Sequence, residues 1–317
     1  MNRMGKFVFL AGLFFLTIGF FFIFKPGIPT FGSPIPKVIA ARDQIKVIND
    51  WFPKTLPADN EGLNLTAKSV LLVDYDSGEV LYQKNVSDKL PAASTVKIMT
   101  ALLVLEGNKL SDTFTVSKKG AEVGEDSMGL TEGEKLSVEE LLYGLMLPSG
   151  NDAAVTIAEG VYGSEDEFVK QMNIKARQLG ADDTKFINAS GLDVDGETQY
   201  TTAVDLATIA HYTWETQKAF RRITSTERIF LDATDAHKAF DLTNDTNLLT
   251  TYPGVRGIKP GFTWESGLCL VTYAENNGKK LLGVILGSAN RRFEMAELLD
   301  FGFSKYGIKV DHPALDL

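Results

Sequence analysis

A serine and a lysine three residues apart, Ser94 and Lys97, are the first pair in the chain whose types and spacing can do chemistry. Pro91 precedes them and an apolar stretch over 98–105 follows, so the pattern predicts a buried helix that begins at Ser94. Side chains three residues apart share one face of a helix, which brings the amine within reach of the hydroxyl. Burial lowers the pKa of a lysine, so Lys97 is able to accept the proton of Ser94. The alternative is an N-cap serine followed by a solvated lysine, which the apolar surroundings disfavour.

A second hydroxyl lies beside an amide in the short connection Ser149-Gly150-Asn151. A capping-box pattern at Ser137 predicts a helix over 138–147, and a further helix is predicted over 152–161. A loop between two helices can hold a hydroxyl and an amide at fixed positions. Taken alone, this pattern is equally typical of a turn followed by an N-cap.

A lysine between two glycines follows near the C-terminus, in the run GIKPGFT over 257–263. Glycine on both sides of Lys259 lets the backbone of a ligand approach the strand closely. Taken alone, the run reads as an edge strand protected by its lysine and proline.

The three motifs occur in the order S-x-x-K, S-x-N and K-x-G, which resembles the signature of penicillin-binding proteins and class A β-lactamases. The blocks at 141–159, 188–193 and 257–263 also resemble those of the low-molecular-mass penicillin-binding proteins, the serine D-alanyl-D-alanine carboxypeptidases of peptidase family S11. The resemblance covers residues 65–305. It implies removal of the terminal D-alanine of peptidoglycan stem peptides, and β-lactam antibiotics as covalent inhibitors.

The resemblance also implies roles for individual residues. Ser94 would be the nucleophile, Lys97 its general base and Ser149 a proton relay. The backbone N–H groups of Ser94 and Phe262 would form the oxyanion hole. The substrate-binding residues implied in this way are Asn151, Lys259, Gly261, Phe262 and Thr263.

Pro260 departs from the family pattern, which usually has threonine at this position. Proline removes both a hydroxyl and an N–H, so the contact to the substrate carboxylate is in doubt. Thr263, Arg291 and Arg292 are the candidates to replace it. The alternative function is therefore a catalytically impaired protein that binds penicillin or peptidoglycan.

A class A-like β-lactamase is a third alternative. Such an enzyme needs a loop glutamate that activates the deacylating water. The candidate here is Glu167, but the pattern after Ser164 predicts that it begins a helix.

The elements around the motifs predict an α+β domain of the β-lactamase and transpeptidase type. Strand pairs are expected at 69–74 with 79–83 and at 268–274 with 280–286, with mostly helical chain between them and a terminal helix over 294–303. Strands from both ends of the chain would then share one central antiparallel sheet covered by a helical cluster.

Composition excludes several classes of function. The net charge of −9 argues against nucleic-acid binding. One cysteine and three histidines make a metal site improbable, and no cofactor is expected. Cys269 is predicted to be a core residue, and His211 and His237 surface residues.

The N-terminus carries an apolar run over 7–24, preceded by two basic residues and followed by a proline-rich stretch. This pattern favours an uncleaved membrane anchor over a cleaved signal peptide, with the rest of the chain outside the cytoplasm. The expected organisation is anchor or signal peptide (1–24), spacer and lead-in (25–64), serine D,D-peptidase domain (65–305) and C-terminal tail (306–317). A cleaved signal would give a secreted protein instead.

Overall fold

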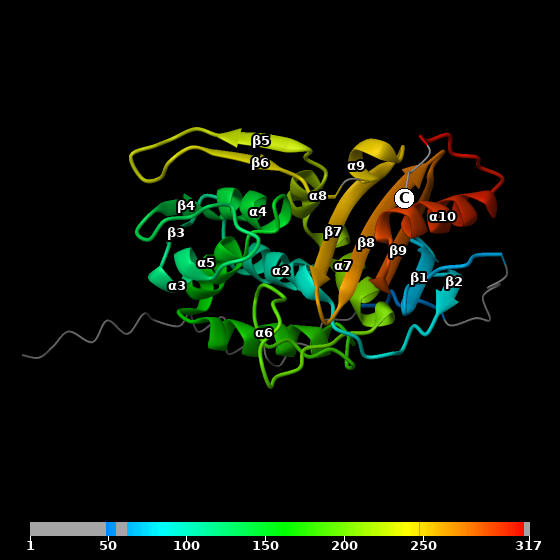
Figure 1. The fold of residues 1–317 in the computed structure, drawn as a ribbon, viewed down its shortest axis with the longest axis horizontal. Helices are drawn as coiled ribbons and strands as arrows, with labels where there is room; N and C mark the ends of the chain where they lie inside the picture. Colours follow the sequence, from blue (N-terminus) through cyan, green and yellow to red (C-terminus); the bar gives the residue numbers. More distant parts are fainter. Residues whose placement is uncertain (1–48, 55–61, 247, 314–317) are drawn as a thin grey trace, which may run out of the picture. The chain divides into compact units, whose positions relative to one another are not determined.

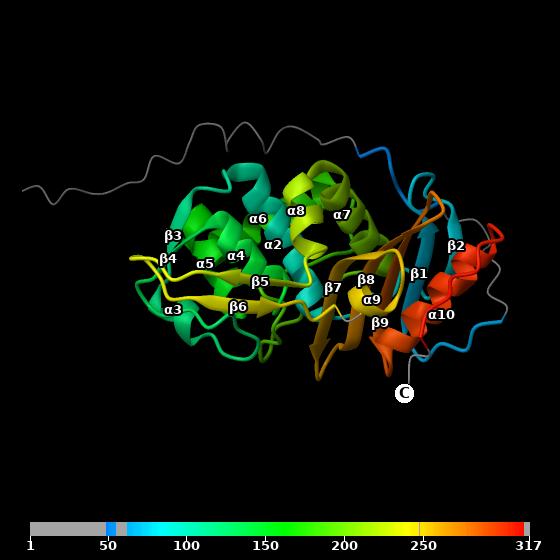
Figure 2. The ribbon, with the colours of Figure 1, turned by 90° about the horizontal axis from the view of Figure 1, so that it is seen from above.

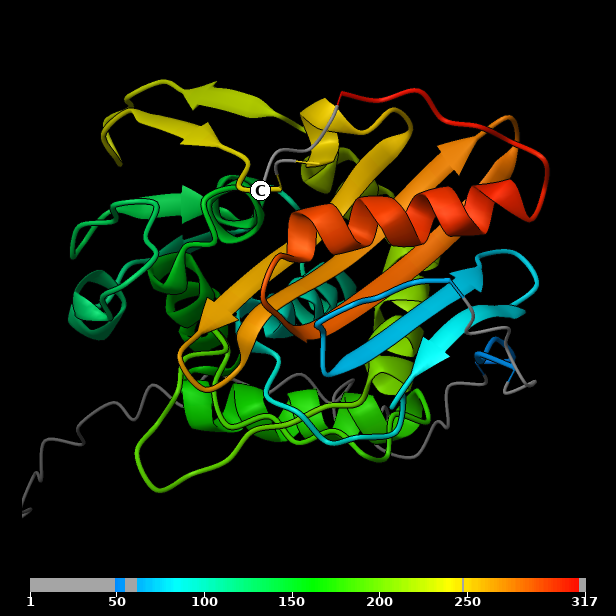
Figure 3. The ribbon, with the colours of Figure 1, turned by 45° about the vertical axis from the view of Figure 1, so that its right-hand side comes forward.

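A five-stranded antiparallel sheet joins the two ends of the folded chain (Figure 3). The computed structural model describes residues 49–54, 62–246 and 248–313. The strands run across the sheet in the order β2 (Val80–Lys84), β1 (Ser69–Asp74), β9 (Lys279–Ser288), β8 (Gly267–Asn276) and β7 (Val255–Thr263). This arrangement confirms the predicted α+β class and the sheet built from N- and C-terminal strands.

Both faces of the sheet are buried, because alternate side chains of β1 belong to two different hydrophobic cores. Leu71 and Val73 belong to one hydrophobic core, and Val70 and Leu72 belong to another. Successive side chains of a strand point to opposite faces, so an unbroken apolar strand requires a cover on each side. The first core contains the helical cluster and the second lies under the C-terminal helix.

The C-terminal helix, α10 (Arg291–Ser304), lies across one face of the sheet, and α7 (Ala203–Thr216) packs on the other (Figure 3). The helix α2 (Lys97–Gly107) is the centre of the helical cluster (Figure 1). Its residues from Lys97 to Val104 are all buried, which agrees with the predicted helix without a polar face. The helices in contact with α2 are α4 (Val138–Met146), α5 (Asn151–Tyr162), α6 (Glu165–Gln178), α7 and α8 (Lys218–Thr224).

Two small two-stranded sheets and two short helices complete the described chain. The hairpin of β5 (Arg228–Leu231) and β6 (Phe240–Thr243) extends alongside the helical cluster (Figure 2). The remaining elements are β3 (Thr113–Thr115), β4 (Lys135–Ser137), α3 (Lys118–Glu122) and α9 (Leu248–Thr251).

The helix predicted to begin at Ser94 begins differently. Ser94 lies in a 3-10 turn, η1 (Ala93–Val96), and the α-helix starts at Lys97. Ala93 has a φ of 47°, a left-handed conformation that non-glycine residues rarely adopt. Such strained positions cluster at functional sites.

The prediction that His211 and His237 lie on the surface is wrong, because both are buried. The His211 ring stacks on Trp51 with 3.8 Å between ring centroids, and burial lowers its pKa to about 4. A neutral imidazole tolerates such a site because it has no charge to desolvate. His237 is held between the carbonyl of Lys238 at 2.8 Å and Glu140 at 3.2 Å. Cys269 is a fully buried core residue, as predicted.

The predicted anchor over 7–24 and most of the proline-rich spacer lie outside the described residues. Within the part of the chain that the structure describes, no helix combines the length and apolar character needed to span a bilayer.

Candidate active site

The amine of Lys97 lies 2.7 Å from the hydroxyl oxygen of Ser94. One helical turn separates the two residues, so the join between η1 and α2 places both side chains on the same face. Two glycines leave the room that this turn needs. A Cβ on Gly191 would lie 2.0 Å from the Ala93 carbonyl oxygen, and one on Gly261 would lie 2.9 Å from the Ser94 nitrogen. The predicted nucleophile and base are therefore in direct contact.

Two further oxygens surround the Lys97 amine: Asn151 Oδ1 and the Ser190 carbonyl, each at 2.7 Å. Both are acceptors only, whereas the Ser94 hydroxyl can donate or accept. A charged amine would donate to all three oxygens. A neutral amine has two N–H groups for the two obligate acceptors, which leaves its lone pair for the Ser94 hydroxyl. The three oxygens accommodate either form, and in the neutral form the basic electron pair is left for the Ser94 hydroxyl.

Burial is the main cause that holds the pKa of the Lys97 ammonium well below its ordinary range, and the positive charge of Lys259 lowers it further. The carboxylates of Asp126, Asp152 and Glu125 oppose this shift. Lys97 is fully buried, so desolvation of the charged form is the dominant effect.

Ser149 and Asn151 form the wall opposite η1. Ser149 adopts a φ of 65°, and its buried hydroxyl has no hydrogen-bond partner among the described residues. Asn151 begins α5, and its backbone N–H donates to the Asp126 carbonyl at 2.8 Å. Its side-chain amide donates to the Gly124 carbonyl at 3.1 Å, which fixes Oδ1 toward Lys97. The short loop therefore holds its hydroxyl and amide as the sequence predicts.

Lys259 is fully buried on β7, and its amine has no hydrogen-bond partner in the described part of the chain. Burial lowers its pKa to about 8, while Asp245 and Asp126 act against the shift. A buried cation without a partner is costly unless an anion completes the site. This lysine is consequently suited to bind the carboxylate of a ligand.

The backbone of β7 also presents donors to the site. The Thr263 N–H donates to Ser266 Oγ at 3.0 Å, toward β8. Successive residues of a strand direct their N–H groups to opposite sides, so the Phe262 N–H points to the free edge. Gly261, the residue before Phe262, approaches the Ser94 nitrogen so closely that a Cβ on it would lie 2.9 Å away. An oxyanion hole requires two backbone N–H groups aimed at one point, and this approach makes Ser94 and Phe262 the candidates.

Residues 55–290 match the peptidase S11 family, described as D-alanyl-D-alanine carboxypeptidase. The chain belongs to this family. The D-alanyl-D-alanine carboxypeptidase DacF of Bacillus subtilis (strain 168) is 38% identical over 76% of this chain, and DacC of Escherichia coli (strain K12) is 32% identical over 77%. This chain spans 63% and 62% of the length of these two relatives.

Solved structures agree with this assignment. A penicillin-binding protein from Listeria monocytogenes, in a cefotaxime-bound form, is 30% identical with a TM-score of 0.69 and covers 77% of this chain and 100% of its own. A mutant of a Streptomyces DD-transpeptidase is 28% identical, with a TM-score of 0.72 and the same coverage of both chains.

Thr263, Arg291 and Arg292 are the candidates to replace the threonine that the S11 pattern has in place of Pro260. They differ in whether their polar groups are already engaged in hydrogen bonds. The Thr263 hydroxyl already bonds to Ser266, at 3.0 Å within the turn after β7. Arg291 donates to the Gly261 carbonyl at 2.6 Å and so lies beside the motif. Arg292 has a buried Nε atom without a hydrogen-bond partner among the described residues. Arg291 is the best placed of the three.

Glu167, the candidate for a β-lactamase glutamate, lies on α6 and bonds to its neighbours Lys170 and Gln171. Its backbone N–H donates to Ser164 Oγ, so it stands in the first turn of that helix as predicted. Nothing in this arrangement favours a β-lactamase.

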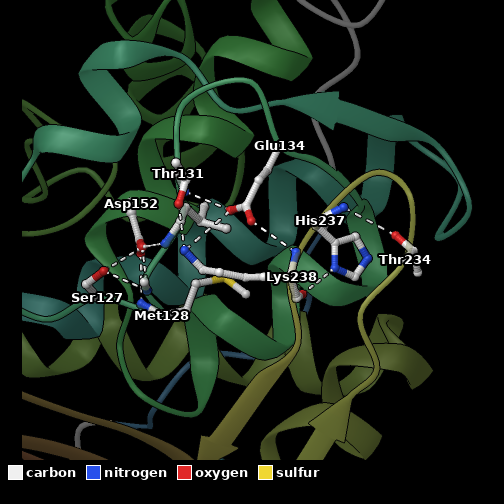
Figure 4. A network of polar contacts seen from close by, with 10 residues as sticks. Ser127, Met128, Thr131, Glu134, Asp152, Thr234, His237 and Lys238 are labelled. Atoms are coloured by element: carbon white, nitrogen blue, oxygen red, sulfur yellow. Dashed lines mark hydrogen bonds and ion pairs between the residues drawn. The ribbon is translucent and has the colours of Figure 1, made fainter.

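Asp152 is a site-positioning residue that the motif analysis missed (Figure 4). Its buried carboxylate accepts a bond from Ser127 Oγ at 2.6 Å and from the backbone N–H groups of Met128, Gly129 and Leu130 at 2.9–3.0 Å. These bonds hold the loop that supplies the carbonyl partners of Asn151. The one feature of the sequence that could have indicated this role is that Asp152 directly follows Asn151 of the second motif.

A second set of hydrogen bonds joins the same loop to the β5–β6 hairpin (Figure 4). Glu134 accepts from the backbone N–H groups of Thr131 at 2.7 Å and of Lys238 at 3.1 Å. Lys238 Nζ donates to Thr131 Oγ1 at 2.6 Å. The hairpin therefore braces the loop from its outer side.

Asp152→Asn replaces one acceptor oxygen by an amide that faces backbone donors. We expect the free energy of unfolding to fall by about 2–3 kcal/mol. Urea unfolding followed by circular dichroism measures this. Asp166→Asn is the matched control, since Asp166 is an exposed acid in the first turn of α6, and its loss should stay below about 1 kcal/mol. Equal losses in the two variants would contradict the proposed role of the loop contacts.

Proposed function

We propose that this chain is a serine-type D-alanyl-D-alanine carboxypeptidase that removes the terminal D-alanine of peptidoglycan stem peptides. The observation that carries the proposal is the buried Lys97 amine, 2.7 Å from both Ser94 Oγ and Asn151 Oδ1. Two buried polar atoms without partners in the described chain, Ser149 Oγ and Lys259 Nζ, supply the remaining functions. The names of the relatives support the same activity.

In the proposed reaction, Lys97 takes the proton of Ser94 while Ser94 Oγ attacks the carbonyl carbon between the two D-alanines. The N–H groups of Ser94 and Phe262 stabilise the negative charge on the carbonyl oxygen. The C–N bond breaks, and the Ser149 hydroxyl relays the proton from Lys97 to the leaving amine. Water then attacks the acyl-enzyme ester and releases the shortened peptide.

In this proposal, the positive charges of the site bind the negatively charged terminal carboxylate of the substrate. Lys259 binds the terminal carboxylate, with the Arg291 guanidinium contributing from beside Gly261. Asn151, fixed by the Gly124 carbonyl, contacts the peptide upstream of the scissile bond. Gly261 and Thr263 shape the edge of β7 along which the peptide lies.

β-Lactams would acylate Ser94 by the same route, because the strained amide replaces the D-Ala-D-Ala bond. The cefotaxime-bound and ampicillin-bound structures of the similar Listeria penicillin-binding protein support this assignment. Two features favour the catalytically impaired alternative: Pro260, and the engagement of the Thr263 hydroxyl by Ser266.

The proposal is tested by incubating the full-length protein with a D-Ala-D-Ala peptide and assaying free D-alanine. We expect release by the wild type and none by Ser94→Ala. A labelled penicillin should be found on Ser94 by mass spectrometry. A label on another residue would exclude Ser94 as the nucleophile. A protein that is acylated at Ser94 yet releases no D-alanine would instead support the impaired alternative.

The pKa of Lys259 gives a second prediction. Deprotonation above pH 8 removes the charge that binds the carboxylate, so kcat/KM should fall with an apparent pKa of about 8. A bound carboxylate raises that pKa, so the alkaline limb of kcat should lie higher. Lys259→Arg should abolish the limb in kcat/KM, since arginine keeps its charge. A limb that stays near pH 8 in this variant would contradict the assignment.

We further propose that residues 7–24 anchor the chain in the membrane, with 37–317 outside the cytoplasm. The basic residues before the apolar run and the prolines after it support this topology. Protease added to cells without their outer wall should degrade the domain. Protection of the domain, while an extracytoplasmic control protein is cut, would overturn the proposal.

A further inference from the structure

The loop over residues 188–192 supplies one of the three oxygens around the Lys97 amine. The Ser190 carbonyl oxygen lies 2.7 Å from Lys97 Nζ. No helix or strand includes these five residues, so the ladders of secondary structure do not fix the direction of this carbonyl group. A side chain must therefore hold it in place.

Asn188 closes this loop on itself. Its Oδ1 accepts from the Gly191 N–H at 2.7 Å and from Ser190 Oγ at 3.3 Å. Its side-chain amide donates to the Leu192 carbonyl at 2.8 Å. The residue is buried, with 8% of its surface exposed, so water does not compete for these bonds. Asparagine often bonds to the backbone a few residues further on in turns, and here it holds three consecutive residues.

The Gly191 N–H and the Ser190 carbonyl are the two ends of one peptide group. A trans peptide group is planar, so its N–H and its C=O point in opposite directions. Asn188 Oδ1 holds the N–H end, and the C=O end is thereby directed at Lys97 Nζ. Rotation of this group would break both hydrogen bonds together. A bonded N–H also polarises the group and makes its carbonyl a better acceptor.

Other contacts fix where the loop lies. Gly191 has a φ of 90°, and a Cβ on it would lie 2.0 Å from the carbonyl oxygen of Ala93, in the turn that carries the nucleophile. From α2, Thr100 Oγ1 donates to the Ala189 carbonyl at 2.6 Å. These contacts hold the loop against the site, and Asn188 determines how its carbonyl group points.

We propose that Asn188 is a positioning residue for the general base. By holding the Ser190 carbonyl on one N–H of Lys97, it keeps the lone pair of the neutral amine directed at the Ser94 hydroxyl. Without this acceptor the amine turns about its Cε–Nζ bond, and the lone pair is no longer confined to that direction. Asn188 is not among the residues assigned to substrate binding, so its effect falls on the chemical step. This inference rests on the proposed function for the role of Lys97.

Stopped-flow acylation by a fluorescent penicillin tests this role, because it separates the acylation rate constant from the dissociation constant of the initial complex. For Asn188→Ala we expect the rate constant to fall about tenfold, a part of the roughly 10²–10⁴-fold that a general base supplies. The dissociation constant should change less than about twofold. Asn188→Ser keeps an oxygen that accepts from the Gly191 N–H, so its rate constant should stay within about threefold of the wild type. Asn188→Leu keeps the side-chain volume without an acceptor, and it replaces Asn188→Ala if the alanine variant does not fold.

Asp74→Ala is the matched control. Asp74 is 9% exposed, and its carboxylate also accepts three bonds: from the Ser77 N–H at 2.8 Å, from Ser77 Oγ at 2.7 Å and from the Tyr306 hydroxyl at 2.8 Å. It closes the turn between β1 and β2, outside the site. Urea unfolding should show a comparable loss of stability in Asp74→Ala and Asn188→Ala, whereas the control should acylate with the wild-type rate constant.

A folded Asn188→Ala protein with the wild-type rate constant would overturn the proposal. Equal falls in Asn188→Ala and Asp74→Ala would do the same, because the effect would then come from lost stability. If penicillin does not acylate the wild type, the proposed function fails, and NMR titration of the Lys97 amine decides the inference separately. The Ser190 carbonyl stabilises the ammonium form, so a lower pKa of Lys97 in Asn188→Ala supports the inference and an unchanged pKa refutes it.

Discussion

The burial of one amine, that of Lys97, is the constraint on which the site depends. Removing a charged ammonium from water costs several kcal/mol, roughly, even in a relaxed protein interior. A neutral amine avoids most of this cost, provided that its two N–H groups find acceptors. Asn151 Oδ1 and the Ser190 carbonyl supply them, and Ser94 meets the lone pair. Three separate segments of the chain must therefore meet at one nitrogen atom.

The fold is organised to keep those segments in place. Lys97 is the first residue of the buried helix α2, which lies at the centre of the helical cluster. The strand β7 contributes Lys259 from the edge of the sheet. Asp152 holds the loop behind Asn151 by bonds to its backbone, and the β5–β6 hairpin braces that loop. The contacts that stabilise this loop therefore also hold Asn151 in position beside the Lys97 amine. Lys259 is a second buried lysine, and its positive charge adds to burial in lowering the pKa of Lys97.

Much of this could be predicted from sequence, because patterns of period 2 and 3.6 report strands and helices directly. The two strand pairs and the contact between Ser94 and Lys97 follow from spacing and periodicity alone. The carbonyl of Ser190 could not be predicted, since a backbone acceptor leaves no mark on residue type. The burial of His211 depends on stacking with Trp51, a contact 160 positions away in the chain. Long-range contacts of this kind are set by tertiary packing.

The most direct test of the account is the second-order acylation rate of Lys97→Arg by a fluorescent penicillin. Arginine keeps the positive charge but cannot act as a base, so the rate should fall by about 10²-fold or more. Lys175→Arg is the matched control. Lys175 is a buried lysine outside the site, with its amine 2.7 Å from the Glu106 carboxylate, and this variant should acylate at the wild-type rate. Circular dichroism establishes that both variants are folded. A folded Lys97→Arg protein that acylates at the wild-type rate would contradict the role of Lys97 as the base.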